Sequence, residues 1–180
     1  MVQDKLLIWK CKRGNQTAFK RIYEKYESDL RTLAANLLED KVAAEDIVQD
    51  VFISFLQILD KFELRNSLSG YLKTCVVNKS RDYARKRQRE TNMTCDFQPV
   101  ISDNNWPVQL VIKDEQVQKL CSAMGRLSYE HREAVVLRLL GQMRFKMIAK
   151  LQNTSIKTVF IRYRTGLDEL KKSFNSEMEK

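Results

Sequence analysis

Glycine and proline are scarce in this chain, which has five glycines and two prolines among 180 residues. Both residue types serve the tight turns that join short strands, so their scarcity argues against a fold rich in β-hairpins. Leu, Lys, Arg, Glu and Gln, which are good helix formers, are plentiful instead. The composition therefore predicts an all-α fold.

Residues that could form a metal or cofactor site are equally few. Cys11, Cys75, Cys95 and Cys121 form no C-x-x-C pair, and His131 is the one histidine. Zinc sites need closely spaced ligands, so we expect reduced thiols, no metal, and a surface or packing role for His131. The sequence also lacks a P-loop and a glycine-rich dinucleotide turn. We therefore predict no cofactor, no small-molecule substrate and no enzymatic activity.

Long apolar runs are missing as well. No stretch approaches the roughly 20 apolar residues that a membrane-spanning helix needs. The apolar patch at Leu6–Trp9 is too short for the core of a signal peptide. We therefore expect a cytoplasmic protein.

Charge is abundant but unevenly distributed. The formal net charge is +9 and the isoelectric point is about 9.4, which favours an anionic partner, either nucleic acid or a membrane surface. Residues 24–60 hold nine Asp/Glu and three Lys/Arg, whereas residues 65–90 hold eight Lys/Arg and two Asp/Glu. A basic helix face suits a polyanion, and an acidic, partly apolar face suits a protein. This contrast predicts an adaptor between a protein machine and DNA or RNA.

Apolar residues recur at helical spacing in two blocks that a different segment separates. The first block predicts helices at about 5–12, 17–38, 43–59 and 68–88. Residues 91–109 contain both prolines and no Lys or Arg, and helical patterning resumes near Val111. We predict two small helical domains, at 1–90 and 110–180, joined by a flexible linker at 91–109.

The predicted helix at 43–59 has an acidic outer face. Its core face comprises Ile47, Val48, Val51, Phe52, Phe55, Ile58 and Leu59. The opposite face carries Asp46, Asp50, Ile53 and Gln57, with Gln49 beside them. An apolar residue among acids and amides favours a protein contact. The alternative is that Glu45 and Asp46 only complement the dipole of the first helical turn.

The predicted helix at 70–88 has a basic outer face. Leu72, Cys75, Val76 and Tyr83 should face inward. Thr74, Asn78, Arg81 and Arg85 should face outward, flanked by Asp82, Lys86, Arg87 and Arg89. Arginine and lysine neutralise phosphates, and Asn and Thr hydrogen-bond to bases. The alternative is a solvated helix end whose cations complement the dipole.

Residues 144–171 have the pattern of a helix-turn-helix. A short helix at 144–151 precedes Asn153, which suits a left-handed turn, and Ser155, which suits an N-cap. The second helix has an apolar stripe at Ile156, Val159, Tyr163, Leu167 and Leu170. Lys157, Ile161 and Arg164 lie opposite, with Thr158, Phe160, Arg162 and Thr165 at the flanks. Residues 141–167 contain six Lys/Arg and no acid, so we favour a DNA-recognition helix over a plain helical hairpin.

The order of these segments resembles a known family. Residues 18–63, which include AEDIVQDVF, resemble the start of the second conserved region of bacterial RNA polymerase sigma factors. GYLKTCVVNKSRDYARKRQRE at 70–90 resembles the rest of that region, and residues 127–172 are similar to the fourth region. The short linker leaves no room for the third-region domain of primary sigma factors. This layout resembles that of extracytoplasmic-function (ECF) sigma factors.

The resemblance implies partners and residue roles. Core RNA polymerase would bind through the β′ clamp helices, at Asp46, Gln49, Asp50 and Ile53, and through the β flap. The −10 promoter element would be captured and melted by Asn78, Arg81, Asp82, Arg85, Lys86, Arg87 and the loop at 65–69. The −35 element would be read by Ser155, Lys157, Thr158, Ile161, Arg162 and Arg164. An anti-sigma factor, often membrane-bound in this family, is implied as a further partner.

Two departures from the family pattern and two alternatives stay open. Phe160 and Ile161 stand where many members carry Lys and a small polar residue, and Gln152-Asn153 replaces the usual Leu-Gly. These departures concern the DNA sequence that the helix reads. One alternative function is a helix-turn-helix regulator with an N-terminal sensing or dimerisation domain. The other, an RNA-binding adaptor, lacks the aromatic stacking platform of such modules.

Overall fold

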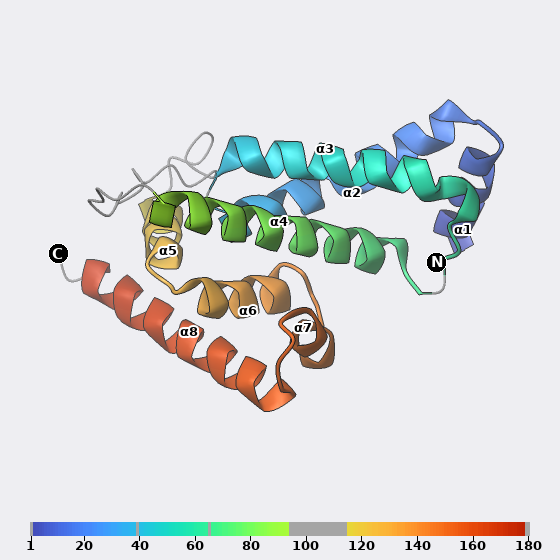
Figure 1. Ribbon diagram of the computed structural model, residues 1–180. Coiled ribbons are helices and arrows are strands. Elements are labelled where there is room, and N and C mark those ends of the chain that lie inside the picture. Colours follow the sequence, from blue (N-terminus) through green and yellow to red (C-terminus); the bar gives the residue numbers. More distant parts are fainter. Residues whose placement is uncertain (1, 39, 65, 94–114, 179–180) are drawn as a thin grey trace.

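The regular structure of the described residues is entirely helical (Figure 1). The computed structural model describes residues 2–38, 40–64, 66–93 and 115–178. The elements are α1 (Val2–Lys12), α2 (Gln16–Leu38), α3 (Lys41–Ile58), the 3-10 turn η1 (Leu59–Lys61), α4 (Leu68–Met93), α5 (Glu115–Gly125), α6 (Tyr129–Leu139), α7 (Phe145–Leu151) and α8 (Ile156–Met178). The all-α prediction is confirmed. Of the predicted linker, 91–93 belong to α4 and 94–109 lie outside the described residues.

Helices α2, α3 and α4 pack side by side, and α1 packs on α2 (Figure 1). Their contact faces carry apolar side chains at helical spacing, and Ile22, Leu30, Val51, Phe55 and Leu72 are each at most 1% exposed. Full burial of one such side chain stabilises the fold by about 1.5–3 kcal/mol. This apolar packing holds α3 and α4 side by side.

The sequence placed Ile58 in the core, and that prediction was wrong. The α-helix ends at Ile58, and the chain tightens into η1 at the next residue. Because a 3-10 turn has fewer residues per turn, the side-chain directions change there. Leu59 remains buried at 7% exposure, whereas Ile58 is 42% exposed.

The helices α7 and α8 form the predicted helix-turn-helix. Asn153 adopts the expected left-handed conformation, with φ of 46°, and Ser155 caps α8 by accepting a hydrogen bond from the Thr158 amide at 3.0 Å. Val159 and Leu170 are buried, as predicted. Ile156, which the sequence placed in the apolar stripe, is 50% exposed instead. It is the first residue of α8, and none of the described helices covers its side chain.

Gly166 allows α8 to approach α6 closely. A Cβ atom at this position would lie 2.9 Å from Val135 Cγ2 and 3.3 Å from the His131 carbonyl oxygen. The first separation is shorter than packed carbon atoms tolerate. The His131 ring also contacts α8, with Nδ1 at 3.2 Å from Glu169 Oε2. Contacts across α6 therefore fix the position of α8.

The two halves of the chain pack against each other. The buried apolar residues form one continuous core, and α6 contacts α2. Lys73 of α4 also donates a hydrogen bond through Nζ to the Gly141 carbonyl oxygen at 3.1 Å. In Figure 1, α6 lies between α4 and α8. Among the described helices, none combines the length and apolar character needed to cross a membrane.

Candidate functional site

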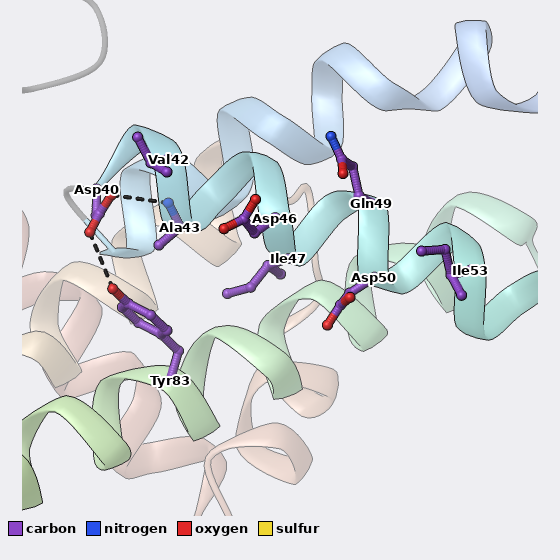
Figure 2. Close-up of a pocket in the computed structure, with 9 residues that line it drawn as sticks. All are labelled: Asp40, Val42, Ala43, Asp46, Ile47, Gln49, Asp50, Ile53 and Tyr83. Carbon is purple, nitrogen blue, oxygen red and sulfur yellow. Dashed lines mark hydrogen bonds between the residues drawn. The ribbon is translucent and has the colours of Figure 1, made fainter.

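The predicted acidic surface lies along the outer side of α3 (Figure 2). We call it the α3 surface, and its five predicted members are all exposed: Asp46, Gln49, Asp50, Ile53 and Gln57. Ile53 is 53% exposed although it is large and apolar. The Asp50 carboxylate contacts Lys79 Nζ of α4 at 3.1 Å, and both side chains remain accessible. Such a surface pair contributes at most about 1 kcal/mol, so a partner could displace it at little cost.

The structure adds Val42 to the α3 surface. Val42 is 71% exposed and helps to line a shallow hollow with Asp46, Asp50, Ile53 and Tyr83. Tyr83 reaches from α4 and donates a hydrogen bond to Asp40 at 3.2 Å (Figure 2). Sequence reasoning missed Val42 because the predicted helix began at residue 43, two residues after its observed start at Lys41. Its position four residues before Asp46, on the same helical face, was the signal.

An interaction with the helix dipole does not explain why an acid stands at position 46. The helix α3 begins at Lys41, and Asp40 caps it by accepting a hydrogen bond from the Ala43 amide at 3.0 Å. Its first turn contains no acid, so Asp46 lies beyond it, and the prediction that Glu45 and Asp46 occupy that turn was wrong. The dipole effect falls off within one turn. An exposed acid beside exposed Ile53 is better explained by a partner surface.

Six of the predicted DNA-binding residues of α4 face solvent and lie before the last turn of the helix. Asn78, Asp82, Arg85, Lys86, Arg87 and Arg89 are all exposed. The helix continues to Met93, beyond its predicted end at 88, and no basic residue falls in its last turn. The alternative of cations complementing a helix end therefore loses its basis. Arg85 contacts Asp82 at 3.8 Å in a largely exposed pair.

Arg81 and Thr74 do not lie on the exposed face that the sequence predicted. Arg81 Nε and Nη2 donate to the two carboxylate oxygens of Glu133, at 2.5 and 2.8 Å, and Thr74 Oγ1 donates to the Gly70 carbonyl oxygen at 2.8 Å. The C-terminal half covers this side of α4, which the sequence could not indicate. Burial opposes the charge of Arg81, yet its bonds to Glu133 prevail and raise the Arg81 pKa. Burial, with Glu133 nearby, also raises the pKa of Tyr129.

The predicted recognition face of α8 is mostly exposed. Ser155, Lys157, Ile161 and Arg164 are exposed, and Thr158 and Arg162 are half-buried. Arg162 Nη1 donates to Gln152 Oε1 at 2.8 Å. Phe160 is 48% exposed and packs edge-on against Phe145, with ring centroids 5.7 Å apart. Cationic and apolar groups thus share one accessible helix face.

Replacing Ser155 with alanine tests the start of α8. The substitution removes the acceptor for the Thr158 amide, so we expect a loss of about 1 kcal/mol in the free energy of unfolding. Urea titration followed by circular dichroism measures this loss. Ser155→Asp, which keeps a cap acceptor, should retain most of the stability. If Ser155→Ala is as stable as the wild type, the cap does not hold this helix end.

Comparison with known proteins adds sequence and fold relatives. Residues 22–90 match the family model described as sigma-70 region 2. The ECF RNA polymerase sigma factor SigW of Bacillus subtilis (strain 168) is 24% identical over 174 residues, covering 92% of this chain and 93% of that protein. The chain therefore contains a sigma-70 region 2 and is similar to an ECF sigma factor over nearly its whole length.

Two solved sigma factor structures share its fold. One is RpoE in complex with the anti-sigma factor NepR from Bartonella quintana, with a TM-score of 0.68, 23% identity, and coverage of 87% of this chain and 96% of that one. The other is CnrH in complex with the cytosolic domain of CnrY, with a TM-score of 0.66, 22% identity, and coverage of 97% and 98%. The region 2 match spans all of α3 and most of α4. Both the α3 surface and the basic face of α4 therefore lie within region 2.

Proposed function

We propose that this sigma factor binds core RNA polymerase, directs it to specific promoters, and initiates transcription by recognising and melting them. The observation that carries the proposal is the pairing of two exposed surfaces within region 2. The α3 surface combines carboxylates with exposed Ile53 and Val42, and the neighbouring α4 presents exposed cations. Phosphates would be repelled by the first surface and attracted by the second.

Core polymerase is the proposed partner of the α3 surface, through the β′ clamp helices. Ile53 and Val42 would supply the apolar anchors, and the carboxylates and amides the polar rim. The C-terminal half would dock on the β flap. With 1–90 as the polymerase-binding and −10-binding domain and 110–180 as the −35-binding domain, each half would contact both polymerase and DNA.

Promoter DNA is the proposed partner of α4 and α8. Arg85, Lys86, Arg87 and Arg89 would neutralise phosphates, and Asn78 would contact bases near the −10 element. The exposed loop residues Asn66 and Ser67 lie just before α4 and would help to hold an unstacked base. Extracting that base costs a few kcal/mol, which binding energy alone would supply without catalysis. On α8, Lys157, Ile161 and Arg164 would face the major groove of the −35 element.

An anti-sigma factor is a further proposed partner. The two solved relatives named above are complexes with NepR and with the cytosolic domain of CnrY. Exposed Phe160 and Ile161 offer apolar area that such a partner could cover when DNA is absent. The protein would act in the cytoplasm, where polymerase and promoter meet.

Transcription in vitro tests the proposed function directly. Purified core polymerase should transcribe from the promoter of the protein's own operon only when this protein is added. A template with an unrelated promoter serves as the control and should stay silent. A helix-turn-helix regulator would instead act only when another sigma factor is already present. Transcription that needs a second sigma factor would therefore favour that alternative.

A further inference from the structure

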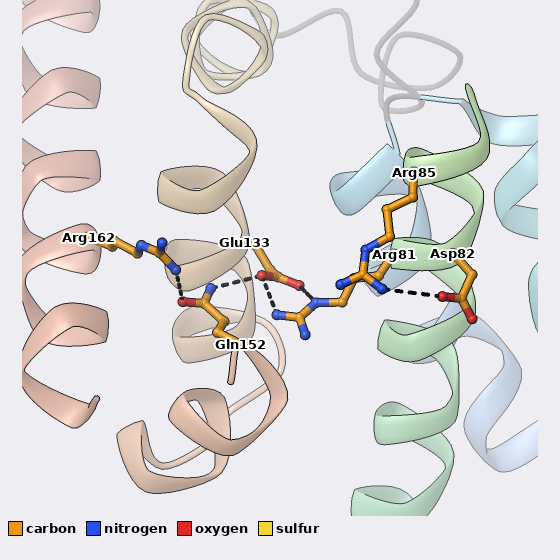
Figure 3. Close-up of polar contacts among 6 residues, drawn as sticks. All are labelled: Arg81, Asp82, Arg85, Glu133, Gln152 and Arg162. Atoms are coloured by element: carbon orange, nitrogen blue, oxygen red, sulfur yellow. Dashed lines mark hydrogen bonds and ion pairs between the residues drawn. The ribbon is translucent and has the colours of Figure 1, made fainter. Parts of the chain in front are cut away.

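One carboxylate, that of Glu133 in α6, joins the two halves of the molecule (Figure 3). Its Oε1 accepts from Arg81 Nε, and its Oε2 accepts from Arg81 Nη2 and from Gln152 Nε2, both at 2.8 Å. Gln152 Oε1 in turn accepts from Arg162 Nη1 at 2.8 Å. A continuous chain of hydrogen bonds thus runs from α4 through α6 to α8.

Burial makes this cluster sensitive to the loss of any partner. Glu133 is 2% exposed, and 14% of the Arg81 side chain is exposed. A buried carboxylate is costly unless donors satisfy it, and here three donors do so. Removing one partner would leave an unsatisfied charge in a site that excludes water, which favours separation of the two halves. A second polar contact, from Lys73 to the Gly141 carbonyl, lies two helical turns away on the same face of α4.

The two arginines at the ends of this chain come from the two proposed DNA-binding elements. Arg81 lies on the −10 side and Arg162 on the −35 side. A carboxylate that accepts two parallel N–H groups from a guanidinium resembles a phosphate in charge and geometry. Arg81 therefore has its phosphate-binding atoms occupied in this conformation, and Arg162 is held against Gln152.

We propose that Glu133 forms an autoinhibitory latch, in which its carboxylate takes the place of DNA phosphate and holds the free sigma factor closed. This inference rests on the proposed function. Promoter binding then requires the latch to open, which frees Arg81 and Arg162 together. Free protein binds DNA more weakly than the open form does, in proportion to the small fraction that is open.

Three single variants of the full-length protein test the latch. Glu133→Gln keeps the side-chain volume but removes the charge. Glu130→Gln, at an exposed position of the same helix, makes the same change in net charge outside the latch. Arg81→Gln breaks the latch from α4 and also removes a proposed DNA contact. Small-angle X-ray scattering measures the radius of gyration, and fluorescence anisotropy measures affinity for a labelled duplex of mixed sequence.

The latch predicts a different pair of results for each variant. Glu133→Gln should expand the molecule and bind the duplex about tenfold more tightly than Glu130→Gln does. Arg81→Gln should expand the molecule without tighter binding. The latch is refuted if a folded Glu133→Gln protein stays compact or binds no more tightly than Glu130→Gln. If Glu133→Gln proves unfolded by circular dichroism, Arg81→Gln decides, and a compact Arg81→Gln protein refutes the latch.

These readouts separate the latch from the proposed function. Binding to a duplex of mixed sequence is electrostatic and needs neither promoter nor polymerase. A protein that opens as predicted but fails to support transcription would keep the latch and refute the promoter function. If the wild-type protein supports transcription but the Glu133→Gln variant stays compact, the promoter function would stand and the latch would be refuted.

Discussion

Reversing the charge of Asp50 and truncating Ile53 together should weaken binding to core polymerase by roughly a hundredfold. Loss of an apolar anchor and of a complementary charge at an interface costs on the order of 3 kcal/mol, which corresponds to that factor. Both side chains are exposed in the free protein, and the Asp50–Lys79 pair is a weak surface contact. Asp50→Lys with Ile53→Ala should therefore leave the fold intact. Fluorescence titration with core polymerase measures the effect.

A matched double variant controls for charge and apolar area. Asp29→Lys with Leu6→Ala makes the same chemical changes at exposed positions of α2 and α1, outside the α3 surface. It should bind polymerase as the wild type does. Circular dichroism should give equal helicity for both double variants. Unchanged polymerase affinity in the Asp50/Ile53 variant would remove the assignment of the α3 surface.

Replacing Arg85 and Arg87 with alanine should impair promoter melting and flatten the salt dependence of DNA binding. Each lost phosphate contact lowers the slope of log affinity against log salt by about 0.9, so the double variant should lose nearly two. Both residues are exposed on α4, and the Arg85–Asp82 pair is a surface contact. The salt slope follows from anisotropy titrations, and permanganate footprinting reports melting.

Two comparisons make this second result specific. Lys5→Ala with Arg21→Ala removes two exposed cations from α1 and α2 and should change neither slope nor melting. Lys157→Ala or Arg164→Ala on α8 should weaken binding to the upstream element instead. Normal melting by the Arg85/Arg87 variant would contradict the proposed role of α4.

Local sequence signals predicted most of the helices and both exposed surfaces. Apolar spacing located α2 to α4, since burial of one face repeats every three to four residues. Asn153 and Ser155 marked the turn and the start of α8 because their conformational and capping preferences act within a few residues. The errors at Ile58, Ile156 and Val42 all lie at helix ends. At a helix end, a shift of one residue redirects the side chains.

The contact between Arg81 and Glu133 could not be predicted in this way. The two residues are 52 positions apart, and no local pattern signals their pairing. A periodic helix indicates which residues share a face, but not which neighbour will cover that face. The sequence therefore assigned Arg81 to the solvent, where an isolated α4 would place it.

The close approach at Gly166 holds α8 against α6, and the residues that are proposed to contact DNA lie at other positions of the helix. The contact with α6 lies on the side of α8 that faces Val135 and His131, where even a methyl group at position 166 would collide. Lys157, Ile161 and Arg164 lie on exposed positions of the same helix, away from that contact. Substitutions at these three positions would leave the close contact between Gly166 and α6 in place. If these residues contact promoter DNA as proposed, a change of promoter preference would require substitutions only at outward-facing positions of α8.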